Sequence, residues 1–372
     1  MSPPKVVVLR GHSANPWELG AWEPLRDRFD VTVAVTRHNL FDVSRLELPS
    51  VEVKTLRDWL PPGRVGDLAV HLPGDRYRGL EELLADADIV HSVEIGTWFA
   101  RQPAELKRRL GFRLVLTVWG TIPYLDRLLD PVRSWHWRRE RRAPLEETDL
   151  FLATTERARR CLLLDGAPPD RIAVAWPGID LERFAASSNG RPALARHLIV
   201  SPGRLVWEKG HHDVLRALAA VGGDHRLLIV GAGPERENLL RYADDLGLGD
   251  RVEIAAVPYD RMPEIFAGAS CVVLASLVTP IWEEQFGMVL AEAMAAGAPI
   301  AAAASGAIPE VLEGSGATLF GPGDWVGLAD ILAERLHGEP AARADYPRWL
   351  VERYSIPAAA ERLAEAYGRV LA

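Results

Sequence analysis

Cysteine is scarce in this chain, and long uninterrupted apolar runs are missing. Two cysteines, Cys161 and Cys271, occur among 372 residues, and they lie in different halves. They provide neither a disulfide framework nor the spacing of a metal site. The uncharged spans 266–282 and 293–309 contain Pro, Gly or Ser, so they suit buried strands with loops better than a membrane helix. No signal-peptide pattern precedes the apolar strand Lys5–Leu9. These absences predict a cytoplasmic protein.

An excess of basic residues is also missing. The formal net charge is −8, which argues against nucleic acid as a partner. Residues 191–372 hold 16 basic and 24 acidic side chains and so account for the whole net negative charge. A basic side chain beside a loop in this half is therefore a candidate for binding an anionic ligand. No acidic cluster with the spacing of a metal site occurs, so we predict no metal and no other cofactor.

The length and the order of patterns predict two α/β domains. A chain of 372 residues exceeds what one hydrophobic core usually serves. A strand over 5–9, a helix over 18–29 and a strand over 31–35 form a β-α-β opening. This order favours a parallel sheet covered on both faces, whose ligands bind beyond the carboxyl ends of the strands. The loops that follow strands are thus the candidate site.

One stretch, residues 282–297, carries the most specific pattern. Glu284 and Glu292 are eight positions apart, with Phe286 and Gly287 between them. Glu284 is expected in a loop after a buried strand. The helix should begin near Gly287 and end at Gly297, which places Glu292 roughly 8 Å up its axis. Unpaired N–H groups near residues 286–288 would face an anion. A ligand that combines negative charge with hydroxyls fits both features, and a nucleotide sugar is such a ligand.

The order Glu-any-Phe-Gly-apolar-apolar-apolar-Ala-Glu-Ala-Met resembles the E-x7-E signature of family 4 retaining glycosyltransferases. The resemblance implies the GT-B fold, with two doubly wound Rossmann-like domains facing across a cleft. It implies an acceptor-binding domain over 1–180, joined by a returning helix at about 355–372. It also implies a domain over 181–354 that binds the nucleotide-sugar donor.

Cations and glycines in the second half extend the donor site. Arg204 and Lys209 follow a buried strand in the segment Gly-Arg-Leu-Val-Trp-Glu-Lys-Gly. A guanidinium and an ammonium can hold a diphosphate together, and the resemblance gives this pair the same task. Gly231 is expected in a tight turn at the pocket rim, and Val257 is expected to line the base. With them we group Glu292, the Phe286–Met288 segment and, as the residue beside the sugar, Glu284.

The first half resembles the family loosely. Gly11 and His12 replace the usual Gly-Gly pair, and Trp119 stands where relatives often carry a His that contacts the donor sugar. An indole can stack on a sugar but cannot shuttle a proton. His91 and Glu94 end a predicted strand and match a segment that lies near the acceptor in the family. These five residues are candidates for contact with the donor sugar or the acceptor.

The most basic run, Arg133–Arg142, interleaves Trp135 and Trp137 with arginines. It could rest on the anionic inner face of a membrane, or it could be a solvated helix with nearby acids as counter-charges. A lipid-linked acceptor is one option under the first interpretation, and a small soluble acceptor or a glycan remains open under the second. The oligomeric state is left open.

We therefore expect a retaining, metal-independent hexosyltransferase of carbohydrate biosynthesis. It would move a sugar from a nucleoside-diphosphate sugar to a small-molecule, glycan or lipid-linked acceptor, with Glu284, Arg204 and Lys209 at the reacting centre. Two alternatives remain. One is a nucleotide-sugar epimerase of the same fold. The other is a catalytically silent binding subunit, which the Trp119 replacement would permit.

Overall fold

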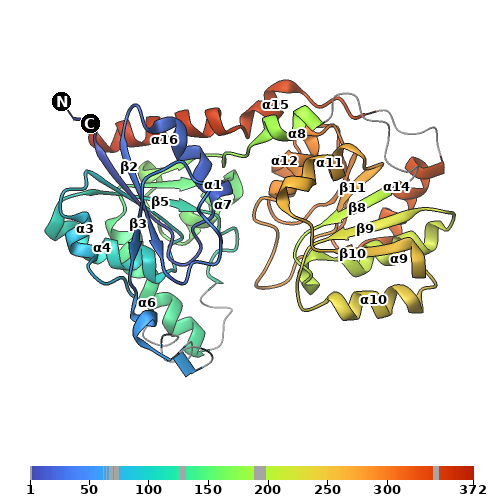
Figure 1. Cartoon of the computed structure of the whole chain (residues 1–372), viewed down its shortest axis with the longest axis horizontal. Helices are drawn as coiled ribbons and strands as arrows, with labels where there is room; N and C mark the ends of the chain where they lie inside the picture. Colours follow the sequence, from blue (N-terminus) through green and yellow to red (C-terminus); the bar gives the residue numbers. More distant parts are fainter. Residues whose placement is uncertain are drawn as a thin grey trace. The chain divides into compact units, whose positions relative to one another are not determined.

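A computed structural model describes residues 2–61, 63, 65–66, 70, 75–125, 131–187, 198–337 and 343–372. The chain divides into two compact units. Unit 1 comprises Met1–Ile179 and Ser355–Ala372, and unit 2 comprises Asp180–Tyr354 (Figure 1). The Ala, Ser, Asn and Gly content of residues 185–192 predicts a linker between the domains. This segment falls partly on helix α8, Leu181–Ser187, and otherwise outside the described residues.

Unit 1 is built on a parallel sheet with the strand order β3-β2-β1-β4-β5-β6-β7. The strands are β1 Lys5–Leu9, β2 Asp30–Thr36, β3 Ser50–Val53, β4 Ile89–Val93, β5 Arg113–Val118, β6 Leu150–Ala153 and β7 Ile172–Val174. The described helices are α1 Pro16–Leu19, α3 Leu80–Leu84, α4 Trp98–Leu110, α6 Pro131–Glu147, α7 Glu156–Leu164 and α16 Ile356–Leu371. Short 3-10 turns are η1 Gly20–Leu25, η2 Leu56–Trp59 and η3 Pro169–Arg171.

Unit 2 repeats the plan with the strand order β10-β9-β8-β11-β12-β13, again all parallel. Its strands are β8 Leu198–Pro202, β9 Arg226–Val230, β10 Val252–Ala255, β11 Cys271–Leu274, β12 Ile300–Ala303 and β13 Thr318–Phe320. Its helices, besides α8, are α9 His211–Val221, α10 Arg236–Asp245, α11 Met262–Ala267, α12 Met288–Ala295, α13 Ile308–Val311, α14 Trp325–His337 and α15 Arg348–Arg353. The 3-10 turns are η4 Trp207–Lys209, η5 Gly249–Arg251 and η6 Tyr259–Arg261.

Both sheets are apolar on both faces, as parallel sheets require. Strands β1, β4, β5 and β6 are buried almost throughout, and β8, β11 and β12 form the same kind of core in unit 2. The expected α/β organisation with two Rossmann-like sheets is confirmed.

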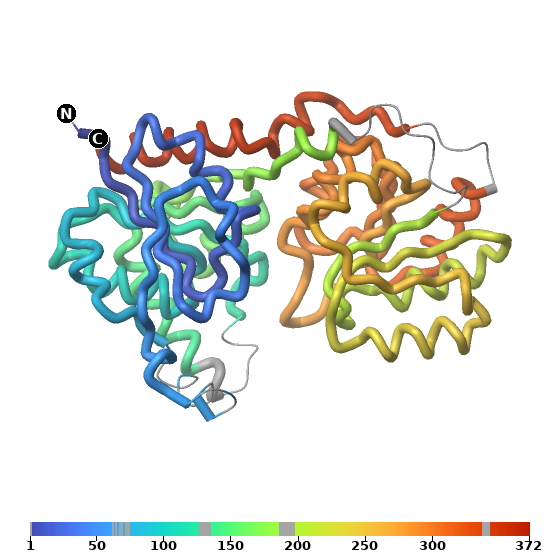
Figure 2. The backbone as a smooth tube through the Cα atoms, in the orientation of Figure 1, coloured from blue at the N-terminus to red at the C-terminus, as the bar shows by residue number. Residues whose placement is uncertain are grey.

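The C-terminal helix α16 belongs to the core of unit 1. Its apolar face, which includes Leu363, Tyr367 and Val370, packs with the β1 side chains Val6 and Val8. Figure 2 shows the red C-terminal segment beside the blue N-terminal one, and α16 contacts η1. The predicted return of the last helix to the first domain is therefore confirmed.

One helix prediction was wrong. The sequence pattern suggested a helix over 18–29, but the segment forms the four-residue α1 and then the 3-10 turn η1, which ends at Leu25. Pro24 lies inside this turn and has no N–H to donate, so a regular helix over 18–29 would lose a hydrogen bond there. The chain then enters β2 at Asp30.

Candidate active site

Each sheet has one position where the chain reverses the direction in which strands are added. In unit 1 this position lies between β1 and β4, and in unit 2 it lies between β8 and β11. Loops leave neighbouring strands in opposite directions there, which opens a crevice at the carboxyl edge of the sheet. Most residues singled out from the sequence follow strands at these two positions.

In unit 2, Lys209 and Glu284 meet between the loops that follow β8 and β11. Lys209 Nζ lies 2.6 Å from Glu284 Oε2. The Ser276 hydroxyl donates to the same oxygen at 2.6 Å. Both charged side chains are largely buried, at 14% and 10% exposed, so water screens their attraction little. Glu284 Oε1 has no hydrogen-bond partner within the described ranges, and it is available to a ligand hydroxyl.

The backbone around Glu284 is fixed by the loop that follows β12. The N–H of Glu284 donates to Ser305 Oγ at 3.1 Å, and the N–H of Ala307 donates to the Glu284 carbonyl at 2.9 Å. Gly306 has φ +53°, and a Cβ there would stand 1.9 Å from the Glu284 carbonyl oxygen. Only glycine can therefore bring this loop so close to Glu284.

Glu292 is buried on the first turns of α12, with 3% of its surface exposed. The Tyr259 hydroxyl donates to its Oε1 at 2.6 Å. Burial raises the pKa of Glu292 to about 7, against a smaller lowering by the Tyr259 hydrogen bond and the Arg183 charge. Its Oε2 accepts no hydrogen bond from the part of the chain that the structure describes. Tyr259 begins the η6 turn two residues after Val257, so the β10 exit and Glu292 share one side of the site.

Helix α12 starts where the sequence predicted. Gly287 adopts φ +80° just before the first helical residue, Met288, and Gly297 adopts φ +66° just after the end. The Phe286 side chain packs against the Tyr354 ring at 5.3 Å and belongs to the core. The Phe286 side chain therefore faces away from a ligand, and the backbone N–H groups of this segment are the part that suits an anion at the helix N-terminus.

Arg204 and Gly231 occupy adjoining loops at the same edge. Arg204 is exposed and follows β8, five residues before Lys209. Gly231 follows β9, and a Cβ on it would lie 1.8 Å from the Gly203 carbonyl oxygen. The backbones of the two loops therefore pass so close to each other that a residue with a side chain would not fit at Gly231. In unit 2 the structure thus gathers two cations and two carboxylates around the N-terminus of α12 and its adjoining loops.

In unit 1, Glu94 and Trp119 meet at the reversal between β1 and β4. The Trp119 backbone N–H donates to Glu94 Oε1 at 2.7 Å. Glu94 has φ +62°, an unusual conformation for a residue with a side chain. Burial raises its pKa to about 7 despite hydrogen bonds from the Trp119 and Gly120 backbone. The Gly11 N–H donates to the Tyr77 hydroxyl at 2.7 Å, and the neighbouring His12 is exposed.

His91 lies inside the core and away from any ligand surface. Its side chain is 0% exposed, and its ring nitrogens lie 2.7 Å from the Tyr367 hydroxyl and 2.8 Å from Thr117 Oγ1. Burial lowers its pKa well below the ordinary value, so the ring is neutral. The Trp22 indole N–H donates to the same Tyr367 oxygen at 2.7 Å. These bonds anchor α16 to the sheet, which gives His91 a structural role.

Sequence reasoning missed several residues of these sites. Ser276 and Tyr259 donate to the two carboxylates, and Ser305 accepts from the Glu284 backbone N–H, but none of the three belongs to a recognisable spacing. Arg10 was also missed, although a charged residue at the end of the apolar strand β1 is a visible signal. Its side chain is 3% exposed, and its Nε and Nη1 atoms find no hydrogen-bond partner in the described part of the chain.

The basic run lies on α6, where its cations have acidic neighbours. Arg139, Arg141 and Arg142 pair with Glu140, Asp165 and Glu146 at 3.2, 2.9 and 3.1 Å. Trp135 is 52% exposed. No described helix is both long enough and apolar enough to cross a bilayer.

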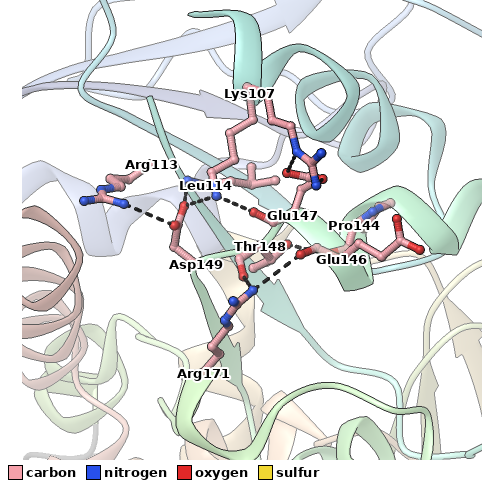
Figure 3. A network of polar contacts seen from close by, with 10 residues as sticks. Lys107, Arg113, Leu114, Pro144, Glu146, Glu147, Thr148, Asp149 and Arg171 are labelled. Atoms are coloured by element: carbon pink, nitrogen blue, oxygen red, sulfur yellow. Dashed lines mark hydrogen bonds and ion pairs between the residues drawn. The ribbon is translucent and has the colours of Figure 1, made fainter. Parts of the chain in front are cut away.

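The end of α6 is tied to the amino edge of the sheet (Figure 3). Lys107 Nζ donates to the Glu147 carbonyl at 2.6 Å and pairs with Asp149 at 2.8 Å. Arg171 donates to the Glu146 and Thr148 carbonyls, as cations near a helix C-terminus often do. This network lies at the sheet edge opposite the candidate site and has a structural role.

The described residues contain no group of three or more His, Cys, Asp or Glu side chains that could hold a metal ion.

Comparisons with known proteins agree with this geometry. The family model described as "Glycosyl transferases group 1" matches residues 187–365, and the model described as "Glycosyltransferase Family 4" matches residues 52–183. Among solved structures, Anabaena HepE in complex with UDP and glucose superposes with a TM-score of 0.76 at 20% identity, covering 98% of this chain and 100% of that one. A sucrose-phosphate synthase from Thermosynechococcus elongatus gives 0.75 at 17% identity, covering 100% and 99%.

The two doubly wound units and these neighbours define a protein of the GT-B fold. The chain belongs to family 4 of the glycosyltransferases.

Curated relatives are similar over part of their length. The D-inositol 3-phosphate glycosyltransferase of Mycolicibacterium smegmatis is 32% identical over 246 residues, which are 61% of this chain and 54% of that protein. The protein of the same description from Mycobacterium tuberculosis strain H37Ra is 34% identical over 218 residues, 54% of this chain and 44% of that protein. The matched region thus spans about half the length of these relatives.

Proposed function

We propose that this protein is a retaining glycosyltransferase that moves a sugar from a UDP-sugar to an acceptor hydroxyl. The observation that carries the proposal is the buried contact between Lys209 Nζ and Glu284 Oε2 at the β8–β11 reversal, beside the N-terminus of α12. Family membership and the UDP complex of the HepE neighbour support the choice of donor. Unit 2 would bind the donor and unit 1 the acceptor.

Arg204 and Lys209 would neutralise the diphosphate. The exposed Arg204 guanidinium can take two phosphate oxygens, and Lys209 adds a point charge from a partly buried position. The N–H groups at the start of α12 would add dipoles aimed at the same anion. Negative charge grows on the leaving diphosphate in the transition state, so these groups stabilise the transition state more than the ground state. They do what a divalent cation does in other transferases.

The two carboxylates would hold different parts of the donor. Glu292 Oε2 would accept from the ribose hydroxyls while Tyr259 occupies Oε1. Glu284 Oε1 would hold a sugar hydroxyl and place negative charge near the anomeric carbon. Val257 and Gly231 would border the base. The chemical step breaks the bond from the anomeric carbon to the diphosphate oxygen and forms a bond to the acceptor oxygen on the same face. The acceptor proton passes to the leaving phosphate oxygen.

A thermal-shift experiment tests the donor site. Wild type and the Lys209→Ala variant are titrated with UDP, GDP and ADP, with and without EDTA. A ligand at about 100 times its Kd adds about 2.7 kcal/mol to folded-state stability. We expect UDP to raise the wild-type midpoint equally with and without EDTA and to raise the variant's midpoint much less. Absence of a shift with UDP would refute the donor assignment, and a shift abolished by EDTA would refute metal independence.

Product analysis then tests the reaction. The protein is incubated with UDP-glucose and a mixture of sugars and cyclitols, and the products are separated. Transfer with the anomeric configuration of the donor supports the proposal. An epimerised nucleotide sugar would indicate an epimerase, and bound UDP without any product would indicate a silent binding subunit.

The proposal includes a cytoplasmic location. For the Arg133–Arg142 run, the ion pairs of Arg139, Arg141 and Arg142 favour a solvated helix over a contact with a membrane surface.

A further inference from the structure

Arg10 has an arrangement that folding alone does not explain. It follows β1 directly, at the strand reversal of unit 1, and its side chain is 3% exposed. Nε and Nη1 are buried and have no hydrogen-bond partner among the residues that the structure describes. The nearest charge is Glu18, with Oε2 3.6 Å from Nη1, which is beyond a good hydrogen bond. The guanidinium carbon lies 5.4 Å from the Trp22 ring centre. Buried donor atoms that lack a hydrogen-bond acceptor are costly, so a side chain that carries two of them usually has a ligand to meet.

A small cavity lies in front of this guanidinium. It has a volume of about 40 Å³, and Arg10 and Glu18 line it together with Thr117, Thr154 and Trp119. A single water requires on the order of 10–15 Å³ of such space, so the cavity admits two or three hydroxyl-sized groups. Threonine hydroxyls at the ends of β5 and β6 add hydrogen-bonding atoms to the wall. This space suits one edge of a ligand whose remainder stays outside.

The charges around the cavity disfavour an anion. Glu18 offsets the positive charge of Arg10, and the Trp119 backbone N–H holds the carboxylate of Glu94 beside the cavity wall. Arg10 and Glu18 both influence the pKa of Glu94, so the three charges act on one another. One cation with two carboxyl groups leaves no net positive charge for a phosphate. Hydroxyl groups fit this set because they accept from a guanidinium and donate to carboxylates. The flat face of an indole also packs well against a sugar ring.

We propose that Arg10, Glu18 and Trp119 form the acceptor subsite, and that the acceptor is a neutral polyhydroxylated molecule, a sugar or a cyclitol, rather than a phosphorylated one. This inference rests on the proposed glycosyl transfer and names its acceptor class. It separates this chain from the curated relatives, whose name refers to a phosphorylated cyclitol. Arg10 then serves to hold acceptor hydroxyls.

The first test compares matched acceptors. Glucose, fructose and myo-inositol are each assayed beside their monophosphate esters, with UDP-glucose as the donor and UDP release as the readout. We expect kcat/KM to be at least about ten-fold higher for a neutral member than for its phosphate ester. Preference for a phosphate ester, or transfer to none of the neutral members, overturns the inference. If UDP still raises the unfolding midpoint in that case, only the acceptor assignment has failed. If UDP binding is absent too, the donor site has failed.

The second test separates binding from structure. Arg10→Gln removes the charge and keeps amide donors. Arg28→Gln is the matched control, because Arg28 lies in the same unit and pairs with Glu361 at the surface. We expect Arg10→Gln to raise the acceptor KM about ten-fold or more, to leave the KM for UDP-glucose within about two-fold, and not to lower the unfolding midpoint. The control should change neither constant. A lowered midpoint with an unchanged acceptor KM would show that Arg10 is structural and would overturn the inference. Arg10→Lys should restore part of the lost affinity.

Discussion

Replacing Glu292 by Gln should stabilise the protein at alkaline pH while it weakens UDP binding. Glu292 is 3% exposed, and its pKa rises from 4.5 to about 7, mainly because of burial. The folded protein therefore keeps a proton between those two pH values that the unfolded chain has already released. By linkage, this group favours folding most below about pH 4.5, and that contribution is lost as the pH rises through about 7. Glutamine cannot ionise and removes the dependence.

The magnitude follows from the shift. One pKa unit corresponds to about 1.4 kcal/mol, so a shift from 4.5 to about 7 corresponds to about 3 kcal/mol at high pH. For a unit of this size, 1 kcal/mol moves the unfolding midpoint by about 2–4 °C. Glu292→Gln should therefore raise the midpoint of unit 2 by about 6–12 °C near pH 8 and change it little near pH 4. Tyr259 can still donate to the amide oxygen, so the packing is kept.

Scanning calorimetry of the free protein at about pH 4 and about pH 8 measures this difference. Glu237→Gln is the matched control, since Glu237 is exposed on α10 of the same unit. Its unfolding midpoint should equal that of wild type at each of the two pH values. The same samples titrated with UDP should show weaker binding for Glu292→Gln, by roughly ten-fold or more, because a charged acceptor for ribose hydroxyls is lost. A variant that is destabilised at the higher pH, or that binds UDP as tightly as wild type, would refute the reasoning.

Three further substitutions test other parts of the structure. Lys209→Ala should weaken UDP binding and lower kcat by about ten-fold or more, whereas Lys54→Ala, at an exposed position of unit 1, should leave both unchanged in steady-state assays. Glu284→Gln should lower kcat with little change in UDP affinity, and equal losses of affinity in this variant and in Glu292→Gln would contradict the separate roles. Tyr367→Phe should destabilise the protein by about 1–3 kcal/mol in denaturant unfolding, because His91 and the Trp22 indole lose their shared partner. An unchanged midpoint would contradict the anchoring role of that hydroxyl.

Local patterns in the sequence carry much of the fold. The strands of both sheets are short apolar runs bounded by turn residues. Such runs can be recognised in the sequence alone because parallel strands are buried on both faces. Helix α12 is also predictable at both ends, since Gly287 and Gly297 adopt positive φ values there. The failed helix over 18–29 shows the limit of this approach. Its apolar spacing suits a helix, but Pro24 and the nearby start of β2 allow only short turns.

The sequence by itself determined the class of the protein and singled out the residues that we propose to face a donor. The E-x7-E spacing and the cations Arg204 and Lys209 are local features, so no tertiary information is needed to single them out. Their individual roles remain predictions for the variants above.

Only the tertiary structure decided which side chains meet. Lys209 and Glu284 are 75 positions apart in sequence and 2.6 Å apart in space. His91 has a core role because Tyr367, 276 positions away, binds its ring. Arg10 resembles an ordinary loop cation in the sequence, whereas the structure shows that its Nε and Nη1 are buried with no hydrogen-bond partner among the described residues. Burial and long-range pairing set the charge state and the available contacts of each group, and both arise only when distant loops converge at the carboxyl edge of a sheet.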